Sequence, residues 1–310
     1  GSVDAGLNDY VAKHYQARHM SWLHSFWGVG ALTGPVIISQ IIARGESWRN
    51  GYLTVALVQF GLVIVLFATL PLWEKIARTG KKPHIDSHTH PPAATAVPAE
   101  AGRKSPASSA KGIFAPLRID GVKPVLLVFL FYCGIEATMG LWGSTFLIER
   151  KGIDVATAAS WVSLFYASIT FGRFISGFIT MRMSSKALIR SGELLILIGA
   201  IGLLLPLPAG VSMLGFILIG LGCAPIFPSM LHETPARFGN AEAQNIMGFQ
   251  MAVAYIGTSL LPPIFGAIAS VTTFGLFPFV ILVYITVMLL NSERINRFML
   301  SKQQFHAATT

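Results

Sequence analysis

The chain has 310 residues, of which 53% are hydrophobic and only 12% are charged. Soluble domains carry about 25% charged residues, so the composition excludes an ordinary soluble domain and indicates lipid as the solvent. The net charge is +9, which by itself would also fit a nucleic-acid partner.

Eight apolar segments are long enough to cross a bilayer. A hydrocarbon core about 30 Å thick needs roughly 20 residues of α-helix. Helices are expected because backbone polar groups in lipid must be satisfied within their own segment. In chain order the predicted spans are Met20–Ala43, Tyr52–Trp73, Pro124–Ile148, Ala158–Met181, Ser191–Pro208, Val211–Leu231, Gln244–Ser270 and Phe274–Ser292. The sequence therefore predicts an all-α membrane protein.

The basic residues alternate with the predicted crossings. If residues 1–12 end a helix on the cytoplasmic side, 18 of the 23 Lys and Arg residues are cytoplasmic. This distribution obeys the positive-inside rule, so the charge reports topology and does not indicate nucleic acid. We expect a multi-pass protein of the inner (cell) membrane, with the C-terminus and the polar segment 74–121 in the cytoplasm.

That polar segment is rich in Pro, Ala, Ser and Lys, which is typical of a flexible linker. It separates a first region, residues 1–73, from a six-helix bundle at 122–293 and a tail at 294–310. Residues 113–119, at its end, are expected to form a short helix on the membrane surface.

No metal, cofactor or catalytic site is predicted, so we do not expect an enzyme. His84, His88 and His90 lie in the linker, where a Pro-rich loop offers no preformed ligand geometry. Cys133 and Cys223 fall within spans and suggest no disulfide framework.

An internal repeat relates the two halves of the chain. Shifting Met20–Ala43 by 227 residues places it on Met247–Ser270. Two pairs of special residues then coincide, Gly30 with Gly257 and Pro35 with Pro262. Each pair would allow close helix contact and a kink at the same depth. Parallel repeats of this kind describe the two halves of major facilitator transporters.

The repeat also predicts where the chain lies within such a fold. Residues 1–12 would be the end of helix 4, and the eight spans would be helices 5 to 12. Roughly 100 residues are then expected before Gly1 in the natural protein, by analogy with the second half. The expected fold is a partial major facilitator fold with two pseudo-repeated bundles.

Several strings resemble the fucose-permease-like branch of the major facilitator superfamily, especially its bacterial members. They are residues 3–8, 18–24 and 28–35 in the first half, and Gly134-Ile135-Glu136, Ala224-Pro225-Ile226-Phe227-Pro228, Gly248-Phe249-Gln250 and Pro262-Pro263 in the second. The resemblance implies transport of a small-molecule solute, often a sugar, by alternating access. It further implies a proton or sodium gradient as energy source, no cofactor, and a monomer in the lipid bilayer.

A second stretch resembles the superfamily's loop motif between helices 2 and 3, in its second-half version. It runs from Gly177 through Arg182 to Lys186, with Met181 where the motif prefers Asp. This resemblance gives Gly177 and Arg182 a structural or gating role, which we also expect for Pro225 and Pro228.

Glu136 is the strongest candidate for a functional site. It lies midway through a predicted span, where an ionised carboxylate costs at least about 2.5–3.5 kcal/mol. A carboxyl at this depth can take up and release a proton, or bond a sugar hydroxyl. The alternative is a structural carboxyl bonded to a neighbouring helix.

Asp4 and Asn8 lie one turn apart on the first helix and are candidates for substrate or coupling residues. His24 and Trp27 share a face of the next helix by their three-residue spacing. Stacking and hydrogen bonding to a sugar would suit this pair, and the Gln250 amide would read hydroxyls. Aromatic residues in spans are more often packing groups, which weakens Trp142, Tyr132 and Tyr166 as candidates.

Arg173 lies about nine residues from the inner end of its span. At that depth an arginine snorkels or pairs with an acid. We interpret it as a structural latch rather than a substrate-binding group.

Two other functions remain open from the sequence. A Gly–Pro pattern from Gly30 to Pro35 resembles helix 5 of antiporters, so an exporter of drugs or metabolites is an alternative to import. The other alternative is a non-transporting membrane remnant or sensor.

Overall fold

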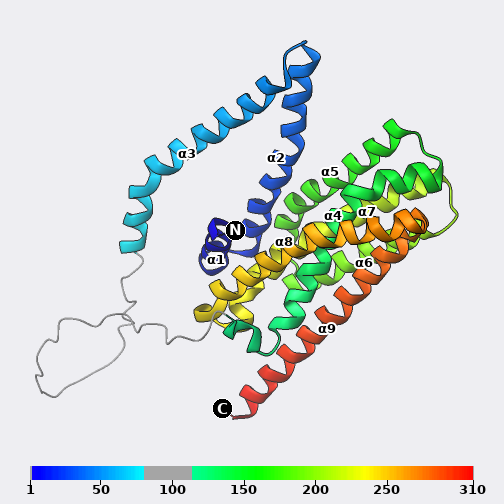
Figure 1. Cartoon of the computed structure of the whole chain (residues 1–310). Helices are drawn as coiled ribbons and strands as arrows, with labels where there is room; N and C mark the ends of the chain where they lie inside the picture. The colour runs from blue at the N-terminus through cyan, green and yellow to red at the C-terminus, as the bar shows by residue number, and fades with distance from the viewer. Residues whose placement is uncertain (1, 80–113, 310) are drawn as a thin grey trace, which may run out of the picture. The chain divides into compact units, whose positions relative to one another are not determined.

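The computed structural model describes residues 2–79 and 114–309, and these fold into helices joined by short turns (Figure 1). Nine α-helices are described: α1 (Ser2–His14), α2 (Ala17–Ala43), α3 (Trp48–Thr79), α4 (Val122–Lys151), α5 (Val155–Ile179), α6 (Ser185–Leu204), α7 (Ala209–Phe238), α8 (Asn240–Val271) and α9 (Phe277–Thr309). Two short 3-10 helices, η1 (Ala115–Arg118) and η2 (Phe274–Leu276), precede α4 and α9.

Seven of the described helices, α3 to α9, are long and apolar enough to cross a membrane. They correspond to seven of the eight predicted spans, and the remaining one, Met20–Ala43, lies within α2. Large apolar side chains such as Ile198, Leu214 and Val283 are exposed on the surface, as expected for a protein whose solvent is lipid.

The chain divides into two compact units. The first contains residues 1–32 and 112–310, and therefore α1, the start of α2 and α4 to α9. The second contains residues 33–111, with the rest of α2 and α3. Within the second unit, Gly45 adopts a φ of +79° in the turn that connects these two helices, a conformation that glycine reaches without steric penalty.

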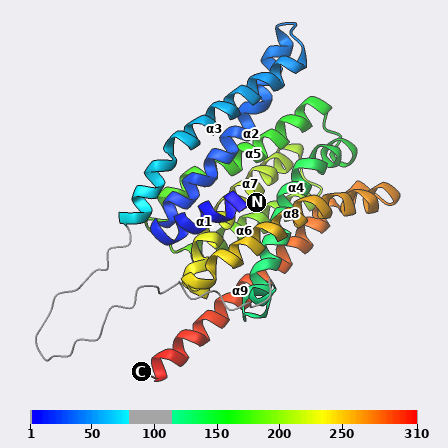
Figure 2. The same cartoon turned by 60° about the vertical axis from the view of Figure 1, so that its left-hand side comes forward.

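The six long helices of the first unit pack along several shared faces (Figure 2). The main partners are α6 with α7, α4 with α8, α5 with α7, and α9 with α4 and α6. Small residues make the closest of these contacts possible. A Cβ added to Gly192 or Gly199 of α6 would meet the backbone of α7 at Gly222 or Gly215. Glycines at helix interfaces are the usual way for membrane helices to approach closely.

Side-chain caps fix the starts of two helices. Asp154 accepts a hydrogen bond from the backbone N–H of Thr157 at 3.0 Å and begins α5. Ser184 accepts one from Ala187 at 3.3 Å and begins α6. The hydrogen bonds from Thr157 lower the pKa of the exposed Asp154 carboxyl below its ordinary value, because they stabilise the charged form.

Some helix ends differ from the predicted boundaries. The expected tail from residue 294 is a continuation of α9, which runs to Thr309, and α3 continues into the expected linker as far as Thr79. The expected surface helix at 113–119 corresponds to η1. His84, His88 and His90 lie outside the described residues. Polar residues ended the predicted spans too early, because hydropathy follows the lipid boundary and not the end of the helix.

Candidate functional site

A cavity of about 420 Å³ lies in the first unit, lined by residues of α1, α2, α4, α5, α7 and α8. Pockets for small molecules typically measure about 300–1,000 Å³. Five of the predicted substrate or coupling residues line it: Asp4, Asn8, His24, Trp27 and Glu136. A hollow of about 490 Å³ on α9 is lined by that helix alone, so it does not bring side chains of different helices together.

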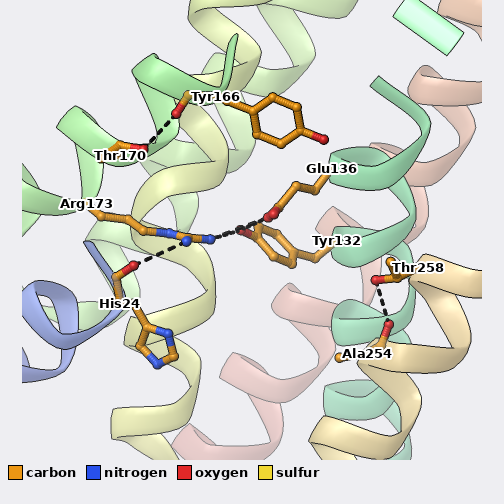
Figure 3. A network of polar contacts seen from close by, with 8 residues as sticks. All are labelled: His24, Tyr132, Glu136, Tyr166, Thr170, Arg173, Ala254 and Thr258. Carbon is orange, nitrogen blue, oxygen red and sulfur yellow. Dashed lines mark hydrogen bonds and ion pairs between the residues drawn. The ribbon is translucent and has the colours of Figure 1, made fainter. Parts of the chain in front are cut away.

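Arg173 is the centre of the polar network in this cavity (Figure 3). It projects from α5, and its side chain is only 4% exposed. Its Nη2 donates to the hydroxyl of Tyr132 at 3.1 Å and to Oε2 of Glu136 at 3.4 Å. Its Nη1 donates to the backbone carbonyl of His24 at 3.4 Å. The guanidinium therefore connects α5 with α2 and α4.

Glu136 and Tyr132 lie four residues apart on α4, so both reach Arg173 from the same helix face. The Tyr132 hydroxyl donates to Glu136 Oε2 at 2.7 Å while it accepts from Arg173. Both hydrogen bonds of the carboxylate thus go to one oxygen. The Glu136 side chain is 17% exposed and lines the cavity, which leaves it accessible to a solute or a proton.

The first two helices contribute the opposite part of the network. The ring nitrogen Nε2 of His24 donates to Oδ1 of Asn8 at 3.1 Å, which links α2 to α1. The guanidinium of Arg173 lies over the Trp27 ring, 4.9 Å from its centroid. Because His24 and Trp27 are three residues apart, one face of α2 supplies both contacts, as their spacing predicted.

Tyr255 of α8 is a cavity residue that sequence reasoning missed. Its hydroxyl donates to Oδ2 of Asp4 at 3.1 Å, and α1 packs against α8 and α7. Met251, Tyr255 and Thr258 line the cavity together, at the spacing of one helix face. That spacing was the available signal, but an apolar helix shows a similar pattern on several faces.

Glycines bring α2 and α5 close enough for these contacts. A Cβ on Gly28 would collide with the side chain of Thr170, and one on Gly177 would collide with the Trp22 ring. Trp22 also donates its Nε1 hydrogen to the carbonyl of Phe174 at 3.2 Å. Gly177 therefore allows the close approach of these two helices, and its gating role stays a prediction.

Gln250 and Trp142, both predicted as substrate candidates, are not among the cavity-lining residues. The Gln250 side chain is fully buried and exchanges hydrogen bonds with Thr234 of α7 at 3.1 and 3.2 Å. Trp142 donates to the carbonyl of Pro262 at 2.8 Å and packs against Phe265. Both residues make contacts between helices, and their role in substrate binding stays a prediction.

Arg173 pairs with an acid and joins helices, as its depth in the span predicted, and it also lines the cavity. Depth in the span gave no information about which way the side chain points.

The remaining structural candidates take different positions. Gly257 packs against the backbone of Leu130, where a Cβ would collide with the Leu130 carbonyl. A Cβ on Gly30 would meet no described atom within 4 Å, so the close contact expected there is missing among the described residues. The side chain of Pro35 lies outside the described residues. Pro225 and Pro228 are buried within α7, and Arg182 is exposed after α5.

Within the described ranges 2–79 and 114–309, no three His, Cys, Asp or Glu side chains gather as a metal site requires. The polar groups of the cavity are hydrogen-bond donors and acceptors and one ion pair. This chemistry suits a hydroxylated or charged small molecule.

The profile of the Major Facilitator Superfamily matches residues 2–262 of the chain. Bypass of stop codon protein 6 from Saccharomyces cerevisiae is 25% identical over 274 residues, which cover 81% of this chain and 52% of that protein. The glucose/mannose transporter GlcP from Bacillus subtilis is 26% identical over 234 residues, covering 74% and 53%. The chain thus spans about half the length of the curated relatives it matches.

Two solved structures share the fold. A variant of the E. coli fucose:proton symporter FucP matches with a TM-score of 0.62 at 15% identity, over 94% of this chain and 72% of that one. FucP in the outward conformation matches with a TM-score of 0.64 at 14% identity and the same coverage. The fold is therefore the all-helical major facilitator fold, as the resemblance implied. The chain belongs to the Major Facilitator Superfamily, a family of membrane transporters and not of enzymes.

Proposed function

We propose that this protein carries out secondary active transport of a small polar solute, such as a sugar, coupled to protons. One observation carries the proposal: a carboxyl, an arginine and a tyrosine are hydrogen-bonded to one another on the wall of a cavity of small-molecule size. Ionisable groups within a membrane are expensive and usually functional. The names of FucP and GlcP support a sugar as the solute.

In this proposal Glu136 is the proton acceptor. As a carboxylate it binds Arg173 and Tyr132 through Oε2. Protonation removes the ionic attraction, which frees the guanidinium and weakens its hold on α4. Because Arg173 also binds the His24 carbonyl of α2, a change at Glu136 is transmitted to the contact between α2 and the bundle. Such a contact is a suitable element for alternating access.

The same proposal places the protein in the cell membrane as a monomer, with the C-terminus and the segment after α3 in the cytoplasm. The support is the excess of Lys and Arg in the segments expected on that side. The direction of transport is found by comparing inward and outward proton gradients: import requires that the inward gradient drives accumulation of the solute, and export that it drives release.

Proteoliposomes test the proposal directly. The protein, expressed from its complete gene, is reconstituted and offered labelled neutral and charged sugars under an inward proton gradient. We expect accumulation that a protonophore abolishes. Glu136→Gln should lose accumulation but keep counterflow exchange, because exchange needs no net proton movement. Arg190→Gln, an exposed arginine of α6, serves as the matched control and should behave like the wild type.

Three outcomes would contradict the proposal. Uptake that ignores the proton gradient would remove proton coupling. Full accumulation by Glu136→Gln would remove the role of this residue. Absence of counterflow with every small polar solute would favour the non-transporting alternative.

A further inference from the structure

One hydrogen-bond donor of Arg173 has no partner among the residues that the structure describes. The Nε atom is buried in a side chain that is only 4% exposed, and it makes no hydrogen bond to any described residue. Leaving a buried hydrogen-bond donor unsatisfied costs free energy, and the cost is larger when the group is charged. The site therefore holds unused binding capacity at an arginine that lines the cavity.

The ion pair that compensates Arg173 is also incomplete. Glu136 approaches with a single oxygen at 3.4 Å, and Tyr132 lies between as a bridge. A carboxylate that binds arginine well does so with two parallel hydrogen bonds. Arginine stays charged at every physiological pH, so protonation of Glu136 leaves the guanidinium without this counter-ion.

We infer that the solute is a small hydroxylated carboxylate, a sugar acid rather than a neutral sugar, and that its carboxylate binds Arg173 when Glu136 is protonated. This inference rests on the proposed function and names its substrate class. The solute carboxylate takes the place of Glu136 as the counter-ion and supplies an acceptor for the Nε hydrogen. The Trp27 ring covers one face of the guanidinium. The solute carboxylate therefore approaches the N–H edge, where protonation of Glu136 weakens its contact with Nη2.

The rest of the cavity suits the hydroxyl groups of such a solute. Asn8, Tyr255 and Thr258 are hydrogen-bonding residues on its wall, and they belong to α1 and α8. Asp4, held by the Tyr255 hydroxyl, accepts hydrogen bonds there and would repel a second carboxylate. The arrangement therefore favours one acid group at Arg173 and hydroxyls elsewhere.

The proton has several titratable neighbours. Titratable groups that interact electrostatically with Glu136 include Tyr132 and Cys133 of α4, Arg173 and Tyr166 of α5, and Cys223 of α7. His24 of α2, Asp4 of α1 and Tyr255 of α8 lie on the same cavity wall. Among these groups Arg173 alone is a permanent cation. Binding of a solute carboxylate to Arg173 therefore depends on whether Glu136 is charged.

The charges balance in each transport step. One monoanion enters together with one proton, so the cavity has the same net charge loaded and empty. Transport of a sugar acid is then electroneutral, driven by the pH difference and insensitive to the membrane potential. A neutral sugar with one proton would carry one positive charge and respond to both.

Binding to the purified protein is the first test. D-glucuronate and D-glucose share the pyranose ring and differ in the carboxylate, so they form a matched pair of probes. We expect D-glucuronate to bind at least about 30-fold more tightly, the size of a charge-assisted hydrogen-bonded pair. Arg173→Gln should abolish the preference, and Arg173→Lys should retain part of it. Arg190→Gln should change neither affinity.

The pH dependence of D-glucuronate affinity is a second measurement, and a purely structural role of Glu136 would not change it. The wild type should lose D-glucuronate affinity as the pH rises, by up to about tenfold per unit for one coupled proton. Glu136→Gln, which imitates the protonated acid, should bind D-glucuronate without this pH dependence.

Transport measured at imposed membrane potentials distinguishes a failure of this inference from a failure of the proposed function. Electroneutral uptake of D-glucuronate, unaffected by valinomycin and potassium, supports the inference even if Arg173→Gln does not fold. Electrogenic, proton-driven uptake of D-glucose with no D-glucuronate binding overturns the inference and leaves the proposed function standing. Failure of both probes to bind or to be transported would overturn the inference and count against the proposed function.

Discussion

Two arginine–carboxylate pairs that join different helices are built in opposite ways. Arg190 of α6 binds Glu293 of α9 with two hydrogen bonds of 2.6 and 2.7 Å, and the side chains are 55% and 37% exposed. Arg173 binds Glu136 through one contact of 3.4 Å inside the cavity. The exposed pair has the better geometry, and the buried pair has the worse.

In the proposed mechanism this difference separates a structural ion pair, Arg190–Glu293, from a functional one, Arg173–Glu136. An exposed pair gains little from ideal geometry because water screens it. A buried pair needs ideal geometry to offset desolvation, so a poor one is retained only where it serves another purpose. A pair that must open and close during transport should be loosely made, and the pair at Glu136 meets this requirement.

The largest effect is expected when each arginine is removed in turn. Arg173→Gln leaves Glu136 without its cation on the cavity wall and should lower the free energy of unfolding by about 3 kcal/mol, as well as abolishing uptake. Arg190→Gln should cost about 0–1 kcal/mol because the pair is exposed. Denaturant or detergent unfolding of both variants measures the contrast. Equal losses would break the comparison.

A pair of glycines on α8 extends the comparison to packing. Gly257→Ala should destabilise the protein by about 1–3 kcal/mol, because the new methyl group meets the Leu130 carbonyl. Gly248→Ala, with nothing within 4 Å, should be neutral or stabilise by up to about 1 kcal/mol through helix propensity. Thermal unfolding in detergent compares them. A destabilised Gly248→Ala would contradict the packing described for α8.

Gln250 and Thr234 provide a buried polar pair that is well satisfied. Thr234→Val alone should destabilise by about 1–3 kcal/mol, since it leaves the Gln250 amide without its partner. The double variant Thr234→Val, Gln250→Leu should recover most of this loss. A double-mutant cycle on unfolding measures the coupling, and uptake by the double variant should persist. Loss of uptake with normal stability would return Gln250 to the solute site.

Asp154 gives the smallest expected effect, because this exposed cap binds only the first turn of α5. Its folded-state pKa is lowered, so the cap contributes stability above the unfolded-state pKa and loses it as the pH falls through the folded-state pKa. Asp154→Ala should remove this acid-side dependence and leave uptake intact. Unfolding measured from neutral to acidic pH tests it, and an unchanged acid profile would contradict the role of the cap.

Hydropathy located the membrane helices because lipid requires an apolar run wherever a helix crosses. The direction in which each side chain points was harder to predict from the sequence. Gln250 differs by one residue, about 100° around a helix, from Met251, and this step separates the contact with α7 from the cavity. A helix that is apolar on every face does not reveal which side meets the cavity. His24 and Trp27 both line the cavity because their three-residue spacing puts them on one helix face.

Arg173 shows a second reason. Its sequence neighbours gave its depth, but its partners Tyr132 and His24 come from residues 41 and 149 positions away in the chain. Only the packing of α2, α4 and α5 brings them together. Pairwise contacts between distant segments of this kind leave no trace in the sequence of one protein.

The most direct test of the account is the number of protons taken up when a solute binds to the purified protein in weakly buffered solution. D-glucuronate and D-glucose are added in turn, and a pH indicator follows the change. The account predicts that the solute that binds brings about one proton per molecule to the wild type, and none to Glu136→Gln. Equal proton uptake by both proteins, or none by the wild type, would contradict the claim that Glu136 and Arg173 form the coupling site.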